Sequence, residues 1–326
     1  MMTQGQINLS RRDFVKSAAL AAGLSAAGRV GSQAIEAAEP AAVGPRRVQP
    51  CLFSKPLGNR KVAELPRILK DLGIDAVDLT CRPGGHVLPE KVADDLPAAI
   101  ERFKAAGVAV PMITTAITDA GKEHAERIVQ TVGRLGIRYL KLGYYLYADM
   151  GRIPATVADA KARLRDVAAL CRQHQVHAGY HIHSGRCVGA AMWDAWQLLE
   201  GLAAEDVGCY FDARHATAEG GLAGWEIGLN LLAPRITLLA VKDFVWRKDA
   251  KGKWAAEDVP LGEGMVRHGQ VLARLKDAAF AGPVSLHTEY CSPKVEPGSA
   301  AEEANFDHIR RDWRTMLDLL RNAGLA

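Results

Sequence analysis

Short apolar segments alternate with longer amphipathic segments along most of the chain. Eight apolar runs have the length of β-strands, and they lie near residues 48–54, 75–81, 108–114, 137–142, 176–182, 207–212, 236–242 and 283–289. Eight segments with the apolar period of a helix lie near residues 61–72, 90–106, 119–135, 156–174, 187–203, 222–231, 265–278 and 302–323. The last segment shows this period most plainly, because its apolar side chains fall on one helical face: Phe306, Ile309, Trp313, Met316, Leu317 and Leu320.

Strands that alternate with helices at this spacing predict parallel β-α-β units. Eight such units predict a closed (β/α)8 barrel, the TIM barrel fold, as a single domain over residues 48–326. The alternative is an open, doubly wound α/β sheet. Neither G-x-G-x-x-G nor G-x-x-x-x-G-K-[ST] follows any of the predicted strands, which favours the closed barrel.

The N-terminal segment has a different pattern and is predicted to direct export. Residues 10–16 read Ser-Arg-Arg-Asp-Phe-Val-Lys and resemble a twin-arginine signal, and the apolar stretch 17–28 is too short to span a bilayer. An amphipathic helix is the alternative, but the three glycines between residues 23 and 31 disfavour it. We therefore expect residues 1–38 to be a signal peptide and linker. The twin-arginine export machinery is then a partner, and the protein is periplasmic or otherwise exported.

Composition and charge narrow the classes of protein. The 326 residues are 48% hydrophobic and 24% charged, which is typical of a globular chain and argues against disorder. No run of 18 apolar residues occurs, so stable membrane insertion is not expected. The net charge of +4 comes without a long basic run, and we therefore expect no nucleic-acid partner.

The six cysteines form no C-x-x-C pair. Export would permit disulfides, but several cysteines lie in apolar, strand-like runs, where this residue serves as a small buried hydrophobe. We therefore expect buried thiols at Cys51, Cys81, Cys171, Cys187, Cys209 and Cys291.

Polar residues collect where the predicted strands end, and this is the end at which barrel enzymes carry their active sites. Going from strand to strand, they are Asp78, Arg82, His86, Lys141, Tyr144, Tyr145, Tyr147, His181, His183, Asp212, Arg214, His215, Lys242, Asp243, Trp246, His287, Glu289 and Tyr290. Because side chains alternate along a strand, His181 and His183 share a face, as do His287 and Glu289. Imidazole and carboxylate groups could thus meet at one point above the barrel.

Imidazoles and carboxylates that converge on a cavity suit a divalent ion such as Zn²⁺, Mn²⁺, Co²⁺ or Mg²⁺. Such an ion would polarise a carbonyl or hydroxyl oxygen of the substrate. The expected metal ligands are His181, Asp212, His287 and Glu289.

The remaining polar groups suit proton transfer and substrate binding, because charged groups in such a site often have shifted pKa values. The expected catalytic residues are His181, His183 and Glu289 as candidate bases and Lys242 as the group that stabilises negative charge. The residues expected to bind substrate are Arg82, His86, Tyr145, His215 and Trp246.

Several of these residues have a structural alternative. Asp212 could cap the helix or turn that follows it. Lys242 and Asp243 could pair only with each other. The aromatic residues could fill the barrel rim, and the Pro-Gly-Gly segment between Arg82 and His86 could be only a turn.

At these residues the sequence resembles the sugar phosphate isomerase/epimerase superfamily, which has a xylose isomerase-like barrel. The resemblance extends over about residues 50–322 and is carried by residues 73–80, 82–90, 180–183, 211–220, 241–243 and 260–264. In the metal-dependent epimerases of the superfamily, Glu, Asp, His and Glu from strands 5 to 8 bind the ion, and the two Glu residues move the proton.

The resemblance implies roles for some positions and breaks the pattern at others. Asp212 and Glu289 match two ligand positions, and His215 matches a residue that often contacts substrate. His181 stands where strand 5 should supply Glu, and Ala240 stands where strand 7 should supply His. A proton shuttle between two Glu residues is therefore not expected in this chain.

The leading hypothesis is an exported, metal-assisted isomerase, epimerase or lyase. Its substrate would be an unphosphorylated sugar, ketosugar or polyol, from which it removes a proton beside a carbonyl group. The alternative is a non-catalytic saccharide-binding barrel, which the residues at strands 5 and 7 motivate. A DNA-repair endonuclease is disfavoured, because the strand ends offer too few ligands for a multinuclear zinc site and a nearly neutral chain binds DNA poorly. The sequence is compatible with a homo-oligomer.

Overall fold

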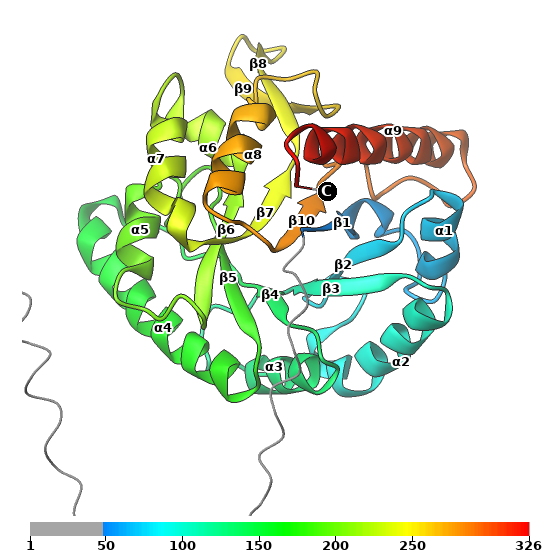
Figure 1. Ribbon diagram of the computed structural model, residues 1–326, viewed down its shortest axis with the longest axis horizontal. Coiled ribbons are helices and arrows are strands. Elements are labelled where there is room, and N and C mark those ends of the chain that lie inside the picture. Colours follow the sequence, from blue (N-terminus) through cyan, green and yellow to red (C-terminus); the bar gives the residue numbers. More distant parts are fainter. Residues whose placement is uncertain (1–47, 326) are drawn as a thin grey trace, which may run out of the picture. The chain divides into compact units, whose positions relative to one another are not determined.

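The computed structural model describes residues 48–325. Within them, eight parallel strands close into a barrel in which each strand pairs with the next barrel strand along the chain (Figure 1). These strands are β1 (Gln49–Phe53), β2 (Ala76–Thr80), β3 (Ala109–Thr114), β4 (Tyr139–Lys141), β5 (His177–His181), β6 (Val207–Asp212), β7 (Ile236–Val241) and β10 (Pro283–Leu286). The predicted (β/α)8 barrel is confirmed. The predicted signal segment, residues 1–38, lies outside the described residues.

Helices surround the barrel and cover its outer face (Figure 1). The α-helices of the described residues are α1 (Leu65–Asp71), α2 (Val92–Ala105), α3 (Ala125–Arg134), α4 (Ile153–Gln173), α5 (Trp193–Leu199), α6 (Ala213–Gly220), α7 (Gly224–Leu232), α8 (His268–Asp277) and α9 (Ala300–Asn322). Short 3-10 helices are η1 (Lys55–Leu57), η2 (Pro89–Lys91), η3 (Met150–Arg152) and η4 (Ala233–Arg235). On α9 the predicted face packs inward: Ile309, Trp313, Met316 and Leu320 are buried, and Phe306 and Leu317 are partly buried.

The buried apolar residues form two clusters, one between the barrel and the helices and one inside the barrel. A large cluster fills the space between strands and helices. A small one contains Cys51, Ala76, Met112, Tyr210, Leu238 and Ala240, with Tyr139 packed against it. Since strand side chains alternate, Lys141 and Lys242 project to the same side as Tyr139 and Ala240, two residues before them. The alternation therefore carries two lysines into the barrel at the carboxyl ends of its strands.

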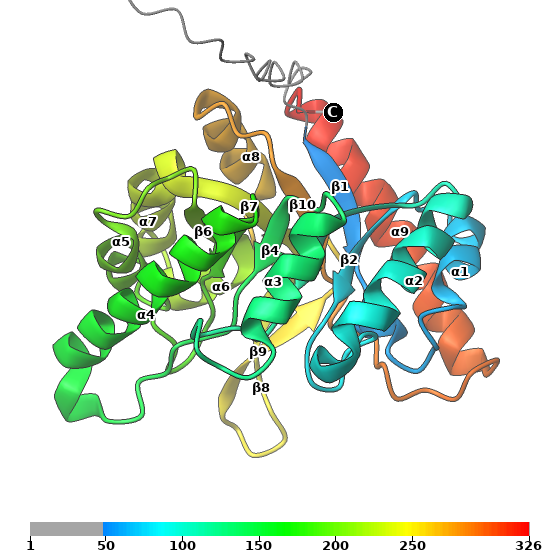
Figure 2. The ribbon, with the colours of Figure 1, turned by 90° about the horizontal axis from the view of Figure 1, so that it is seen from below.

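An antiparallel hairpin follows β7 and was not predicted. It consists of β8 (Asp243–Lys248) and β9 (Trp254–Val259), and it projects from the lower end of the barrel in Figure 2. Its turn is held by Asp249, whose carboxylate accepts hydrogen bonds from the backbone N–H groups of Lys251 and Lys253. Half of the twelve strand residues of the hairpin are exposed, so neither strand has the continuous apolar run that marks a barrel strand.

Two further expectations concern burial and hydropathy. All six cysteines lie within the described residues, and each is a buried free thiol, as expected. Among the helices of residues 48–325, none is both long and apolar enough to cross a membrane.

Candidate functional site

The carboxyl ends of the barrel strands enclose a polar cavity of about 160 Å³. Its lining holds four cationic side chains, three imidazoles and one carboxylate. The residues that line it are Phe53, Lys55, Arg82, Thr114, Lys141, Tyr144, His181, His183, Tyr210, Lys242, His287 and Glu289. Asp212 and His215 lie directly behind this lining and contact it. The structure therefore brings all four sequence-predicted catalytic residues, His181, His183, Lys242 and Glu289, to one place.

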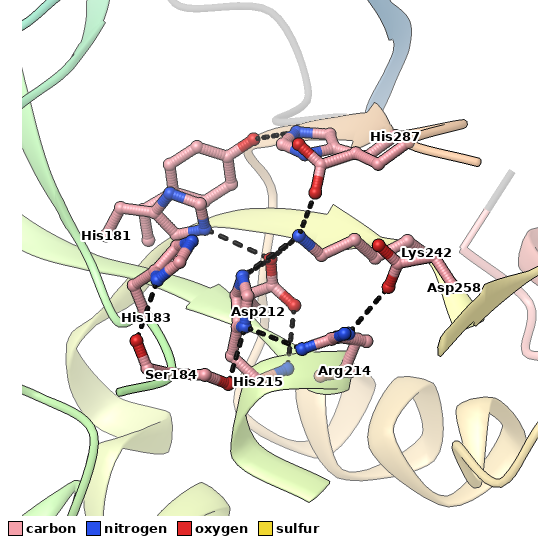
Figure 3. Close-up of polar contacts among 12 residues, drawn as sticks. His181, His183, Ser184, Asp212, Arg214, His215, Lys242, Asp258 and His287 are labelled. Atoms are coloured by element: carbon pink, nitrogen blue, oxygen red, sulfur yellow. Dashed lines mark hydrogen bonds and ion pairs between the residues drawn. The ribbon is translucent and has the colours of Figure 1, made fainter. Parts of the chain in front are cut away.

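Asp212 is fully buried at the end of β6 and uses its two oxygens differently (Figure 3). Oδ1 accepts a hydrogen bond from the backbone N–H of His215 at 3.0 Å and so caps α6. Oδ2 lies 3.1 Å from His181 Nε2 and 3.3 Å from Lys242 Nζ. Burial alone would raise the pKa of Asp212, but His215, Lys242 and His181 together hold it well below its usual value. Asp212 is therefore both a helix cap and a buried carboxylate of the site.

Lys242 reaches from the end of β7 to the centre of the polar cluster (Figure 3). Its Nζ lies 2.9 Å from His215 Nε2 and 2.9 Å from Glu289 Oε2, in addition to the contact with Asp212. Burial lowers the pKa of Lys242, but Asp212 and Glu289 outweigh burial and raise it. An ammonium group thus lies between two carboxylates, and the predicted Lys242 site residue is in place.

Glu289 follows β10 and closes this arrangement from the cavity side. Its Oε1 accepts a hydrogen bond from Lys55 Nζ at 2.9 Å, while Oε2 contacts Lys242. Burial would raise its pKa, but Lys242 and the neighbouring His287 and Lys55 lower it far below the ordinary value. Glu289 is accordingly ionised and held by two lysines.

His181 is a neutral imidazole with both ring nitrogens engaged. Burial lowers its pKa to about 4, although Asp212 opposes this shift. Because an ionised Asp212 can only accept, His181 Nε2 carries the proton, and Nδ1 can accept a hydrogen bond from the Tyr144 hydroxyl at 3.1 Å. Its ring also stacks on Tyr210 with centroids 4.4 Å apart. A buried carboxylate, an imidazole and a phenol are thereby linked in one chain that ends at the cavity.

His183 differs from His181 in having a ring nitrogen available. Its Nδ1 donates a hydrogen bond to the backbone carbonyl of Ser184 at 3.0 Å, which fixes the proton on Nδ1. Its ring packs on His215 with centroids 3.9 Å apart, and burial lowers its pKa. Nε2 therefore carries a lone pair and has no hydrogen-bond partner among residues 48–325. Such a nitrogen can accept a proton.

The expected metal ligands do not form a metal-binding group as they are arranged. The Lys242 ammonium takes the position between Asp212 and Glu289, and His181 offers a proton rather than a lone pair to Asp212. His287 contacts the Tyr210 hydroxyl through Nε2 at 3.1 Å, and its buried Nδ1 lacks a partner, but one imidazole does not make a site. Across residues 48–325, no three His, Cys, Asp or Glu side chains are placed to hold an ion. The donor set does not fit a divalent metal.

Of the five predicted substrate-binding residues, two belong to the site and three do not line the cavity. Arg82 lines the cavity, and His215 supports it from behind. His86 is bonded at both ring nitrogens, to Thr80 Oγ1 and to the Leu57 carbonyl, and holds its own loop.

Tyr145 and Trp246 do not line the cavity. Tyr145 is buried against Tyr180, with ring centroids 5.5 Å apart. Trp246 lies on β8 with 42% of its surface exposed. These two aromatic residues are therefore placed away from the candidate site.

Lys242 and Asp243 do not pair with each other, contrary to the structural alternative. Asp243 accepts backbone hydrogen bonds from Phe244, Gly262, Gly264 and Val266. A Cβ atom on Gly264 would overlap the Asp243 carboxylate, so this close approach requires glycine. The segment 260–264 is thus tied to the end of β7 and positions the base of the hairpin.

No catalytic or binding role was predicted for several residues that line the cavity. Lys141 and Tyr144 were noted only as polar residues at the end of β4, and Phe53, Lys55, Thr114 and Tyr210 were not singled out. Lys141 could have been found from strand phase, because it lies two residues beyond the inward-facing Tyr139. Lys55 follows β1 directly, so its position after a strand end was the available signal.

Comparison with known proteins identifies the class. The family model described as xylose isomerase-like TIM barrel matches residues 66–323, so the chain belongs to this family. Curated proteins show no significant sequence match.

Solved structures resemble the chain in fold at low sequence identity. A xylose isomerase-like TIM barrel protein from Mycobacterium smegmatis in complex with magnesium has a TM-score of 0.62 at 16% identity, covering 83% of this chain and 92% of that chain. The probable 3-DHS dehydratase AsbF of Bacillus anthracis, involved in petrobactin synthesis, has a TM-score of 0.61 at 13% identity, covering 82% and 98%. An L-ribulose 3-epimerase has a TM-score of 0.62 at 13% identity, covering 84% and 95%.

Proposed function

We propose that the chain is an enzyme that removes a proton beside the carbonyl group of a sugar or sugar-derived substrate, and that the outcome is isomerisation, epimerisation or elimination. Family membership supports this, as does the similarity in fold to an L-ribulose 3-epimerase and to a probable dehydratase. The observation that carries the proposal is the cavity itself, where His183 offers a free ring nitrogen beside the Asp212–Lys242–Glu289 cluster.

His183 is the proposed general base. Its Nε2 takes the proton from the carbon next to the carbonyl, and the electron pair of that C–H bond forms the double bond of an enediolate. The carbonyl π electrons move to the oxygen, which becomes negative. Return of the proton to the other face or to the neighbouring carbon gives an epimer or an isomer, and loss of a β-substituent gives an elimination product.

Lys242 supplies positive charge to this step. Its ammonium is fixed by Asp212, His215 and Glu289 before substrate arrives, so it need not reorganise when negative charge develops on the substrate oxygen. His181 and Tyr144 form the second proton-transfer pair, because their hydrogen bond joins a cavity hydroxyl to the buried carboxylate of Asp212.

Zinc, manganese, cobalt or magnesium assistance is not carried into this proposal. A neighbour was solved with magnesium, but the donor set of this chain already encloses an ammonium group. Every step above is therefore assigned to side chains of the chain.

Export is part of the proposal and is supported by the twin-arginine-like residues 10–16. N-terminal sequencing of the protein recovered from a periplasmic fraction tests it. Cleavage between residues 32 and 42 is the expected result, and an intact N-terminus in the cytoplasmic fraction alone contradicts export.

Exchange with solvent deuterium tests the enzyme activity without knowledge of the product. We would incubate a panel of aldoses, ketoses and keto-glycosides with the protein in D₂O and follow the C–H signals beside the carbonyl by ¹H NMR. Loss of a signal at one carbon is expected for at least one sugar. Sugar binding without exchange would instead support the saccharide-binding barrel.

A further inference from the structure

Two of the four cations in the cavity lack a carboxylate partner. Lys55 and Lys242 form ion pairs with Glu289 and Asp212, whereas Arg82 and Lys141 form no ion pair within residues 48–325. We propose that Arg82 and Lys141 form an anion subsite, so that the substrate carries a carboxylate or phosphate group in addition to its carbonyl. This inference rests on the proposed function and names its substrate class, a sugar acid or sugar phosphate rather than a neutral sugar.

Lys141 is the stronger half of this argument. It is only 3% exposed, it lines the cavity, and its Nζ lies 3.9 Å from the centroid of the Tyr144 ring. A cation–π contact offsets only part of the free-energy cost of burying an ammonium group. A buried cation that faces a cavity without a carboxylate partner is therefore a group prepared for an anionic ligand.

Arg82 completes the subsite from the loop after β2. Its guanidinium lies 5.7 Å from the centroid of the Phe53 ring and makes no side-chain hydrogen bond among the described residues. The guanidinium fork matches the two oxygens of a carboxylate or phosphate. Arg82 thus has all of its side-chain donors available for a ligand.

A third buried carboxylate, that of Asp78, makes no direct contact with this pair. Its oxygens accept hydrogen bonds from Thr114 Oγ1 at 2.8 Å and Ser285 Oγ at 2.9 Å, and it forms no ion pair with either cation. Asp78 is fully buried within the barrel, and although this burial raises its pKa to about 6, the carboxyl group is still ionised at neutral pH. One carboxylate that pairs with neither group thus stands against two cations, which leaves a net positive charge here when Lys141 is protonated.

The subsite and the proton-transfer groups come from different parts of the barrel. Arg82 follows β2 and Lys141 is the last residue of β4, whereas His183, Lys242 and Glu289 follow β5, β7 and β10. A substrate that spans the cavity can place its anionic group at one side while its carbonyl faces the other. The charge of the substrate would then fix which carbon lies beside the base.

The ionisation of Lys141 agrees with this arrangement. Burial, with Arg82 adding to it, lowers the pKa of Lys141 to about 7. A bound anion favours the ammonium form, so binding should take up a proton above neutral pH. The subsite would then hold its ligand more weakly as pH rises through about 7.

Thermal unfolding with two small anions tests the subsite without knowledge of the sugar. Inorganic phosphate and glycolate would be titrated at constant ionic strength into the full chain and into Arg82→Gln, Lys141→Met and Lys141→Arg. Lys70→Met, on the exposed face of α1, is the control. At least one anion should raise the Tm of the parent protein by about 2 °C or more. The shift should be lost in Arg82→Gln and Lys141→Met but kept in Lys141→Arg and Lys70→Met.

The outcomes separate the subsite from the reaction. A larger shift with glycolate indicates a sugar acid, and a larger shift with phosphate indicates a sugar phosphate. No shift with either anion, or the same shift in Arg82→Gln and Lys141→Met, overturns the subsite. Deuterium exchange measured on matched neutral sugars, sugar acids and sugar phosphates tests the function separately. Exchange on neutral sugars alone leaves the proposed function standing and rejects the anionic substrate. An anion shift without exchange on any of the three kinds of sugar rejects the proposed function alone.

Discussion

The ammonium group of Lys242 lies 2.9 Å from the carboxylate of Glu289 and joins the ends of two adjacent barrel strands, β7 and β10. The same ammonium contacts Asp212 on the next strand, β6. Three strand ends are therefore tied by one positive charge, and this charge defines the electrostatics of the candidate site.

Removal of the Lys242 ammonium should convert the site into one that binds metal. In Lys242→Met, Asp212 and Glu289 would face each other without an intervening cation, with His215 close by. We expect the parent protein to contain well below one divalent ion per chain and the variant to gain affinity for Zn²⁺ or Mn²⁺. Metal analysis and calorimetric titration measure both. Lys55→Met is the control, because it removes a lysine contact of Glu289 from outside the carboxylate pair. A stoichiometric ion in the parent protein would contradict the assignment.

Loss of the Glu289 charge should impair turnover and leave the fold intact. Glu289→Gln keeps the shape of the side chain but removes the negative charge that holds Lys242 and Lys55. We expect deuterium exchange to fall about 100-fold or more, with the circular dichroism spectrum unchanged. Exchange at the parent rate in this variant would remove Glu289 from the mechanism.

The two histidines His183 and His86 provide a matched comparison. His183→Gln should lower exchange by roughly 10²–10⁴-fold, because it removes the proposed base. His86→Gln should instead lower the free energy of unfolding by roughly 1–3 kcal/mol, because it breaks hydrogen bonds to Thr80 and Leu57 outside the cavity. Exchange rates per folded molecule and denaturant unfolding separate the two effects. If His86→Gln loses exchange and His183→Gln does not, the assignment of the base is wrong.

The buried ammonium group of Lys141 is expected to lower the free energy of unfolding of the protein at neutral pH. Its folded pKa of about 7 lies below its unfolded value, so the unfolded chain binds more protons between the two values and the stability contribution of this residue rises with pH there. Arg82, Lys242, Asp78 and Glu289 face it and contribute to the shift. Lys141→Met should therefore be more stable than the parent by roughly 1–4 kcal/mol near pH 7, with the difference shrinking toward pH 10. Denaturant unfolding of both proteins across this range checks it, and a constant difference would contradict the buried-cation interpretation.

Most of the fold could be predicted from the sequence, because buried parallel strands and amphipathic helices leave strong apolar patterns. The hairpin β8–β9 and the helix α6 were missed for the opposite reason. Half of the hairpin's strand residues are exposed, and α6 begins at Ala213, directly after its cap Asp212, within a run of residues that resembles a loop. Tertiary contacts, rather than apolar period, stabilise both.

The candidate site was predicted in part. Strand-end position identified His181, His183, Lys242 and Glu289, which the cavity unites. Strand-end position could not predict that Tyr144 lines the cavity while Tyr145 does not. The backbone after β4 is irregular, and the direction of each ring depends on local packing. Ala240 stands where the family pattern has a metal-binding His, and the sequence did not indicate which side chain takes that role in this chain. Lys242, two residues further along the chain, projects to the same side and places its ammonium group between Asp212 and Glu289.

Asp212 couples the formation of α6 to the positioning of the side chains in the site. One carboxylate oxygen begins the helix, and the other orients an imidazole and an ammonium group. A substitution there is pleiotropic: alanine would remove the cap and the charge together, whereas asparagine could keep the cap and lose only the charge. Residue 212 is therefore constrained both by the helix and by the site. We expect substitutions that change the chemistry of the barrel to occur first at the ends of the other strands.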